Sequence, residues 1–295
     1  MNIKVSFFLT LLILLCLFVA CRSEQAKTEI QLSDNTKVLL LDSSSAAKSI
    51  VKDDVEGFFE KITSVDMMIQ MGKEYPDGTN REVILDDYKK FIQADVLNFT
   101  REEADFLAEI LSEAYELCQK AEIKFFPVEI KLIKTHGKHY GDDTYYTREN
   151  AIVIPKQALK MKDNEVFLKV ILHEISHIVT RLNPTLKTDL FSIIGFTKIT
   201  PPFTMSDSLR QRLLTNPDGI ELNWATQLTV FEGQNVMATP LIYANEIQYK
   251  KGKKEFFNYM GFNFFEVMPS QDNKTYEVLT IGNQQKSTLN TEGIN

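Results

Sequence analysis

The sequence carries a His-Glu-x-x-His pattern, formed by His173, Glu174 and His177. On an α-helix, side chains four residues apart lie one turn apart on the same face, so both imidazoles can bind one Zn²⁺ ion. The glutamate would then stand beside the metal, where its carboxylate can activate a metal-bound water as a general base. With four histidines and 40 acidic residues in the chain, this pattern is expected about 0.007 times by chance, so it indicates a metal site.

The element that must position these side chains is a helix predicted from about Asn164 to Leu182, where an Asn-Pro pair ends it. With His173 at 0° on a helical wheel, His177 falls at about 40° and Glu174 at about 100°. Arg181 falls at about 80°, where its guanidinium can hold a carboxylate: either a third ligand or an acid behind it. The apolar side chains gather on the opposite face (Leu168, Ile171, Ile175, Ile178, Val179 and Leu182). Further apolar residues flank the chemical face, so we expect it to be recessed.

A catalytic zinc ion needs a third protein ligand and one open position. No histidine follows His177, so the third ligand is expected to be a carboxylate. Asp218 is the first candidate, because its tight Pro-Asp-Gly turn would hold a short carboxylate rigidly, although aspartate is also an ordinary turn residue there. Glu246 is the second candidate. The remaining alternatives are Asp189, Glu221 and Glu232.

The order of a strand, a polar loop, a short strand and the motif helix resembles the zincin-type zinc metallopeptidases over about residues 125–220. The five-residue motif supports the superfamily better than any subfamily, because the metzincin histidine and the downstream glutamate of thermolysin-like enzymes are both absent. In that superfamily an edge strand pairs with extended substrate, and the resemblance assigns this role to Ala151–Ile154. The runs HEISHIVTRLNP, IIGF and TNPD also resemble bacterial envelope proteins, a likeness that indicates no substrate.

Three weaker candidates lie outside the motif. His139 or Tyr146, in the loop before the short strand, could donate a hydrogen bond to an oxyanion. His136 and His139 could form a second metal site, but no acidic residue stands at a supporting spacing. Cys118 is expected to be a small buried side chain in an amphipathic helix.

The composition excludes several classes of protein. With 44% hydrophobic and 25% charged residues, the chain is globular and not disordered or fibrous. The net charge of -7 argues against a nucleic-acid partner, because such proteins usually present a basic surface. Two of the three cysteines lie in the apolar N-terminus, so a disulfide framework is excluded.

The N-terminus has the layout of an export signal. Lys4 precedes an apolar run over residues 5–20, and Phe18-Val19-Ala20-Cys21 resembles a bacterial lipobox with Phe in place of the usual Leu. We therefore expect cleavage after residue 20, with Cys21 lipid-anchored to a bacterial membrane of the cell envelope. Plain secretion and an uncleaved anchor are the alternatives, although the run is shorter than the ~20 residues of a membrane span.

These observations predict an α+β, zincin-like fold. The expected organisation is a signal peptide at 1–20, a tether with at most one strand at 21–45, a single metallopeptidase-like domain at 46–270 and a polar tail at 271–295. Within the domain, 46–122 is expected to be helical, 123–220 to be the catalytic core with its small sheet, and 221–270 to be strand-rich. A capping box at Thr100 and Glu103 begins one of the helices.

The function predicted from the sequence is that of a zinc-dependent hydrolase, most specifically a peptidase acting on a peptide or protein. The alternatives are a non-catalytic zincin-like binding lipoprotein with structural zinc, and a metal-binding or chaperone-like envelope factor. Neither the cleavage specificity nor the oligomeric state follows from the sequence.

Overall fold

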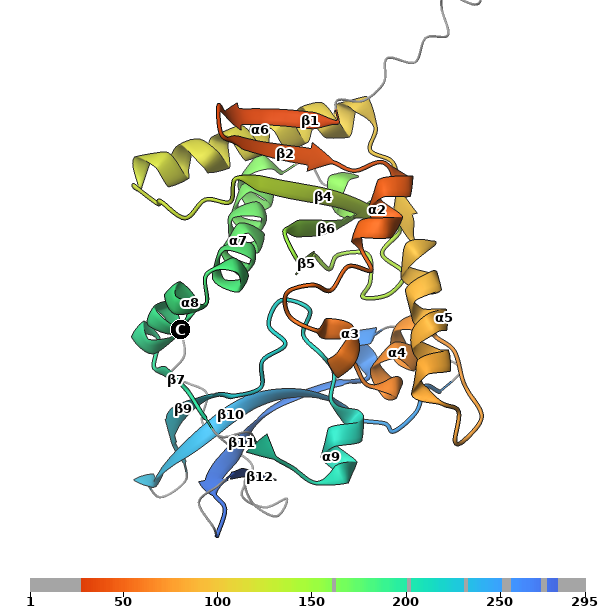
Figure 1. The fold of residues 1–295 in the computed structure, drawn as a ribbon, viewed down its shortest axis with the longest axis vertical. Coiled ribbons are helices and arrows are strands. Elements are labelled where there is room, and N and C mark those ends of the chain that lie inside the picture. The colour runs from red at the N-terminus through yellow and green to blue at the C-terminus, as the bar shows by residue number, and fades with distance from the viewer. Residues whose placement is uncertain are drawn as a thin grey trace, which may run out of the picture.

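The computed structural model describes residues 28–160, 163–200, 203–230, 233–250, 256–271 and 275–280. Within them the fold is mixed α+β, as expected, with eight α-helices and two six-stranded sheets. The first sheet lies at the top of Figure 1 and the second at the bottom, with α7 and α8 along one side and α5 along the other. The predicted signal peptide and Cys21 lie outside the described residues.

The helices are α2 (Ser43–Ser49), α3 (Phe58–Lys61), α4 (Ser64–Met71), α5 (Arg81–Gln93), α6 (Arg101–Lys120), α7 (Asn164–Leu182), α8 (Pro184–Ile193) and α9 (Asp207–Arg212), with short 3₁₀ turns η1 (Ala158–Lys160) and η3 (Phe256–Asn258). The strands are β1 (Glu29–Ser33), β2 (Thr36–Leu40), β3 (Val96–Leu97), β4 (Glu129–Thr135), β5 (Tyr146–Arg148), β6 (Ala151–Pro155), β7 (Phe196–Lys198), β8 (Phe203–Thr204), β9 (Trp224–Thr229), β10 (Asn235–Ala244), β11 (Met260–Pro269) and β12 (Tyr276–Thr280).

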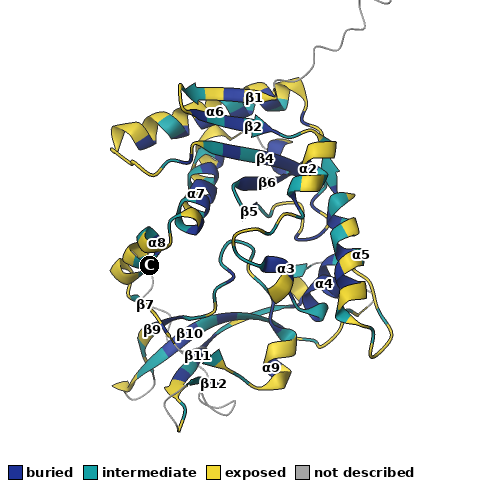
Figure 2. Cartoon of the chain, in the orientation of Figure 1, coloured by how far each residue is buried: buried dark blue, intermediate teal, exposed yellow. Residues whose placement is uncertain are grey.

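The first sheet has the strand order β1-β2-β4-β6-β5, with β3 paired to the end of β4. Strands β2, β4 and β6 run parallel, whereas β1 and β5 are antiparallel to their neighbours. The prediction that the short strand at 151–154 forms the edge of the sheet is therefore wrong. This strand lies as β6 between β4 and β5, and all five of its residues are buried, as in Figure 2. A continuous apolar run is typical of a strand covered on both faces.

The N-terminal part of the described chain also belongs to this sheet. Residues 28–45 were expected to be a tether, but β1 and β2 form a hairpin and β2 pairs with β4. Ile30, Val38 and Leu40 are buried, because alternate residues of the hairpin face the core. The folded body therefore begins well before residue 46.

Two hydrophobic cores flank the first sheet. On one face, α6 and α7 cover Ile152 and Ile154 of β6 together with side chains of β2 and β4. On the other face, the helices α2 to α5 pack against Ala151 and Val153. The capping box predicted for α6 is present, since Thr100 and Glu103 each accept a hydrogen bond from the other's backbone N–H.

The second sheet has the order β7-β9-β10-β11-β12-β8 and confirms that the C-terminal part is rich in strands. Strand β12 at 276–280 pairs with β11, so the expected polar tail at 271–295 is wrong for these five residues. Between α9 and β9, residues 213–223 form a loop that reaches back to the first sheet. Leu214 and Ile220 of this loop are buried in the core of α2 to α5.

Candidate functional site

The helix α7 has the predicted bounds and carries the whole His-Glu-x-x-His pattern. Asp163 caps its N-terminus by accepting a hydrogen bond from the Val166 N–H at 3.1 Å. Its apolar side chains, including Ile171, Ile175 and Ile178, are buried against α6 and the sheet. This packing fixes the rotation of the helix, and with it the direction in which the motif residues point.

The two imidazoles of the motif converge. The Nε2 atoms of His173 and His177 lie 2.9 Å apart, and the rings are nearly perpendicular, with centroids 4.5 Å apart. His173 is exposed and His177 is half-buried, so the expected recess does not extend to His173. Burial lowers the pKa of His177, against the opposing charge of Asp218, which favours the neutral imidazole that a metal requires.

Glu174 is buried beside the imidazoles. It is 4% exposed, and its Oε2 atom has no hydrogen-bond partner among the described residues. Burial, followed by the charge of Asp218, raises the pKa of Glu174 to about 8, while Arg181 acts in the opposite direction. A buried carboxyl group with such a pKa can exchange a proton near neutral pH, as a general acid or base must.

Asp218 lies close enough to change the pKa of both Glu174 and His177. Its Oδ1 atom accepts two hydrogen bonds of 2.6 Å, from the backbone N–H and from the hydroxyl of Thr147 on β5. Within the part of the chain that the structure describes, no three histidine, cysteine or acidic side chains stand close enough together to hold a metal ion. The structure thus brings the charge of Asp218 within range of His177 and Glu174 without completing a ligand set.

Arg181 pairs with a carboxylate, as predicted, but the partner is Glu56, which was not among the candidates from the sequence. Its Nε donates to Glu56, from the loop before α3, and both side chains are largely buried. Its other nitrogens donate to the Thr147 hydroxyl at 2.8 Å, to the Glu149 carbonyl at 3.2 Å and to the Pro217 carbonyl at 2.9 Å. Arg181 therefore joins α7 to β5 and to the loop that carries Asp218.

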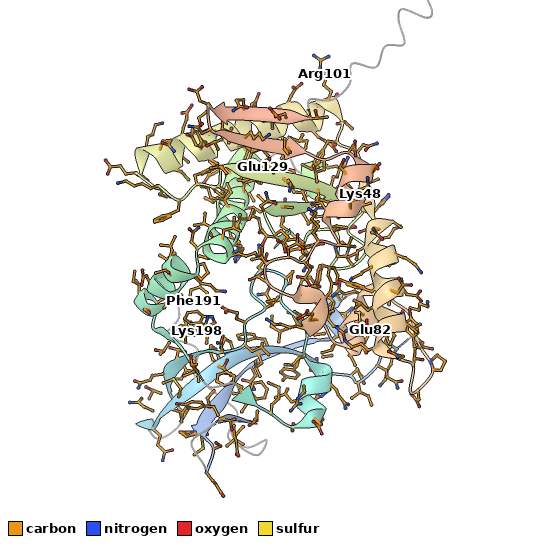
Figure 3. All side chains as sticks on the ribbon, viewed as in Figure 1. Lys48, Glu82, Arg101, Glu129, Phe191 and Lys198 are labelled. Carbon is orange, nitrogen blue, oxygen red and sulfur yellow. The ribbon has the colours of Figure 1, made fainter. Side chains whose placement is uncertain are left out.

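The other candidates for the third ligand pair with lysines, are exposed or lie outside the described residues. Glu221 accepts from Lys198 and Trp224 and pairs with Lys187, contacts that lower its pKa to about 2 and tie α8 to β7 and β9. Figure 3 labels Phe191 and Lys198 in this region, on the α8 side of the second sheet. Glu246 pairs with Lys250, and Asp189 is exposed on α8. Glu232 lies outside the described residues.

A cavity of about 460 Å³ opens beside the motif. Its lining includes Val170, His173 and Glu174 of α7, together with Tyr145 and Phe257. Burial, the charge of Asp143 and that of Glu174 raise the pKa of Tyr145 to about 12, so its hydroxyl stays protonated and can donate a hydrogen bond. Sequence reasoning missed Tyr145 and chose its neighbour.

The prediction that Tyr146 or His139 donates to an oxyanion is wrong, because both side chains lie on the face of the sheet opposite α7. The hydroxyl of Tyr146 is 2.8 Å from His139 Nε2, and His139 Nδ1 is 3.0 Å from Asp95 Oδ2. All three side chains are buried in the core of α2 to α5 or at its margin. His136 instead contacts Lys156 at 3.2 Å, and the described residues give the two loop histidines no shared metal site. Cys118 is buried in α6, as expected.

Comparisons of the chain with family models, with curated proteins and with solved structures find no significant match. Among the described residues, no helix has both the length and the apolar character that a membrane crossing requires. The interpretation of the site therefore rests on its own geometry.

Proposed function

We propose that the protein is a zinc-dependent hydrolase, most specifically a peptidase, with its site on α7. The observation that supports this most strongly is the convergence of the His173 and His177 Nε2 atoms at 2.9 Å beside the unpaired buried oxygen of Glu174. Two nitrogens bound to one tetrahedral zinc ion are about 3.4 Å apart, so side-chain rotations that separate them by about 0.5 Å would admit the metal.

Asp218 is the third ligand in this proposal. Its Oδ1 atom is occupied by Thr147, whereas its Oδ2 atom takes no hydrogen bond from any described residue. A carboxylate with one oxygen held and the other free is suited to bind a metal through the free oxygen. Among the described residues His173, His177 and Asp218 do not stand close enough together to form a ligand set, so a movement of Asp218 toward the imidazoles is part of the proposal.

Glu174 moves the proton in the proposed reaction. A zinc ion at this site would supply the Lewis acidity that polarises water and the scissile carbonyl. The nearby positive charge would lower the pKa of Glu174 from its raised value, so its carboxylate could accept a proton from the attacking water and deliver it to the leaving amine. Tyr145, across the cavity, would donate its hydroxyl proton in a hydrogen bond to the developing oxyanion.

We propose a peptide or protein in the cell envelope as the substrate, reached through a lipid on Cys21. The export signal and lipobox-like segment support this location, and the cavity bounded by Tyr145, Val170 and Phe257 offers an apolar wall for a side chain next to the scissile bond.

The test uses the lipid-free body and two matched glutamine variants on α7. Metal analysis should find one zinc per chain in the wild type, in Glu174→Gln and in the control Glu165→Gln, whose exposed carboxylate pairs with Lys169. The rate of hydrolysis is measured with an unfolded protein as the substrate, and the fragments are identified by mass spectrometry. Glu174→Gln should hydrolyse this substrate about 10²- to 10⁴-fold more slowly than the wild type. The control should keep the wild-type rate. Undiminished hydrolysis by Glu174→Gln, or a wild type without zinc, would contradict the proposal.

A second candidate is a non-catalytic binding lipoprotein with structural zinc, and the state of β5 favours it. The outward N–H of this edge strand donates to Asp218, and all three strand residues are buried, so extended substrate cannot pair there as it does in zincins. Cobalt substitution separates the two: a fourth protein ligand would favour the binding protein, and an exchangeable water would favour the enzyme.

A further inference from the structure

We propose that a second cavity, remote from the His-Glu-x-x-His motif, binds an organic anion with an apolar body, such as a medium-chain carboxylate. The cavity has a volume of about 570 Å³ and is lined by α4, the loop 74–79, the start of α5, α9 and the segment 247–249. The helices α4, α5 and α9 lie together at the lower right of Figure 1. The two cavities share no lining residue among those that the structure describes, so this inference goes beyond the proposed function and does not depend on a metal ion.

The floor of this cavity belongs to the hydrophobic core of α2 to α5. Four of its lining side chains are buried members of that core: Ile62, Val65, Met68 and Ile84. The rings of Tyr75 and Tyr249 pack against the same core and also line the cavity. Cavities of roughly 300–1,000 Å³ with apolar walls and a few polar groups are typical of sites for small organic molecules. The apolar body of a ligand would therefore cover this floor.

The charged side chains that line the cavity carry more positive than negative charge. The basic residues are Lys61, Arg81 and Arg210, and the acidic residues are Glu74 and Asp77. Asp77 already accepts a hydrogen bond of 3.0 Å from the side-chain amide of Gln248. Three cations against two anions are a local excess of positive charge on a chain whose net charge is -7. This excess favours a ligand with an anionic group.

Arg210 is the cation best placed to bind that group. Its side chain is 61% exposed, it donates to the Met205 carbonyl at 3.2 Å, and it lies 3.9 Å from the carboxylate of Asp207. Arg81 instead donates from one terminal nitrogen to three backbone carbonyls at the end of α3, those of Phe59, Glu60 and Ile62. Arg210 therefore keeps donors for a carboxylate, which a guanidinium can bind through two parallel hydrogen bonds.

The experiment is an NMR titration of the purified protein with octanoate and with its uncharged counterpart, octanol. Octanoate should bind saturably and shift the methyl signal of Met68, and octanol should bind about tenfold more weakly. Arg210→Gln should raise the dissociation constant for octanoate about tenfold. The matched control is Arg212→Gln, on the same helix, because the Arg212 guanidinium lies over the ring of Tyr243 and outside the lining; it should leave the constant unchanged.

A second pair of variants tests the apolar part of the site. Ile247→Ser removes an exposed apolar side chain from the lining and should weaken octanoate binding. Val83→Ser removes a similarly exposed side chain of α5 that does not line the cavity, and it should have no effect. None of the four substituted side chains is buried, so each variant is expected to fold.

Three results would overturn the inference. The first is a wild type that shows no saturable binding of octanoate. The second is octanol binding as tight as octanoate binding, or an unchanged affinity for octanoate in Arg210→Gln, because either would remove the role of the anionic group. The third is a set of shifted signals that includes Val170 and not Met68, because the ligand would then lie in the cavity beside the motif.

Discussion

A buried carboxyl group, Asp66 on α4, should make stability fall as pH rises. Asp66 is fully buried and accepts hydrogen bonds from Gln70 Nε2 and from the backbone N–H of Thr215, each at 2.7 Å. Burial raises its pKa from about 3.8 to about 7, and the two hydrogen bonds offset only part of the rise. The folded protein therefore keeps this proton at pH values where the unfolded chain has lost it.

The size of the effect follows from that pKa. A rise of about three powers of ten in proton affinity corresponds to about 4 kcal/mol in the free energy of unfolding, as an upper bound. Because the pKa is raised in the folded state, this stability is fully present below about pH 4 and is lost as pH rises through about 7. The loss is complete once Asp66 is ionised in both states.

Urea denaturation of the wild type and of Asp66→Asn, from about pH 4 to about pH 9, measures this contribution. The amide stays neutral, so the difference in unfolding free energy, wild type minus variant, should decrease by up to about 4 kcal/mol across this range. Other titrating groups cancel in the difference. A difference that stays constant with pH would refute the reasoning, and an increase with pH would reverse its sign.

Two further predictions concern the site. Arg181→Met leaves Glu56 and the Thr147 hydroxyl without their buried partner, so the free energy of unfolding should fall by about 3–5 kcal/mol. Glu56→Gln keeps a hydrogen-bond acceptor for Arg181, so its free energy of unfolding should fall by less. Equal losses for the two variants in urea denaturation would contradict this reasoning. Tyr145→Phe should keep the zinc content and lower kcat by about 10²- to 10³-fold with KM little changed, whereas a change in KM alone would assign Tyr145 to substrate binding.

Local patterns in the sequence predicted the helices of the site well. The bounds of α7 follow from apolar periodicity and an Asn-Pro stop, and the start of α6 follows from the capping box. Both signals act over a few residues, so a single sequence contains them. The placement of the imidazoles needs only the pitch of a helix, and it was predicted for the same reason.

Contacts between distant segments were not predictable in this way. Thr147 and Asp218 are 71 residues apart, and no local pattern links a strand of three residues to a Pro-Asp-Gly turn. The choice of Tyr146 over Tyr145 failed because side chains alternate along a strand, so a register wrong by one residue reverses the face. The prediction that residues 151–154 form the edge strand was wrong because β5 lies outside them in the sheet. With only three residues, β5 is too short to show periodicity in the sequence.

The early start of β1 has a consequence for a protein anchored at Cys21. With β1 beginning at Glu29, seven residues would separate the proposed lipid on Cys21 from the sheet, and a fully extended chain of that length spans at most about 25 Å. This segment is shorter than the diameter of a small domain, so the folded domain would stay close enough to touch the bilayer surface. Under the proposed function and anchor, the protein would reach only the layer of envelope next to its own membrane, and its substrates would have to come to that layer.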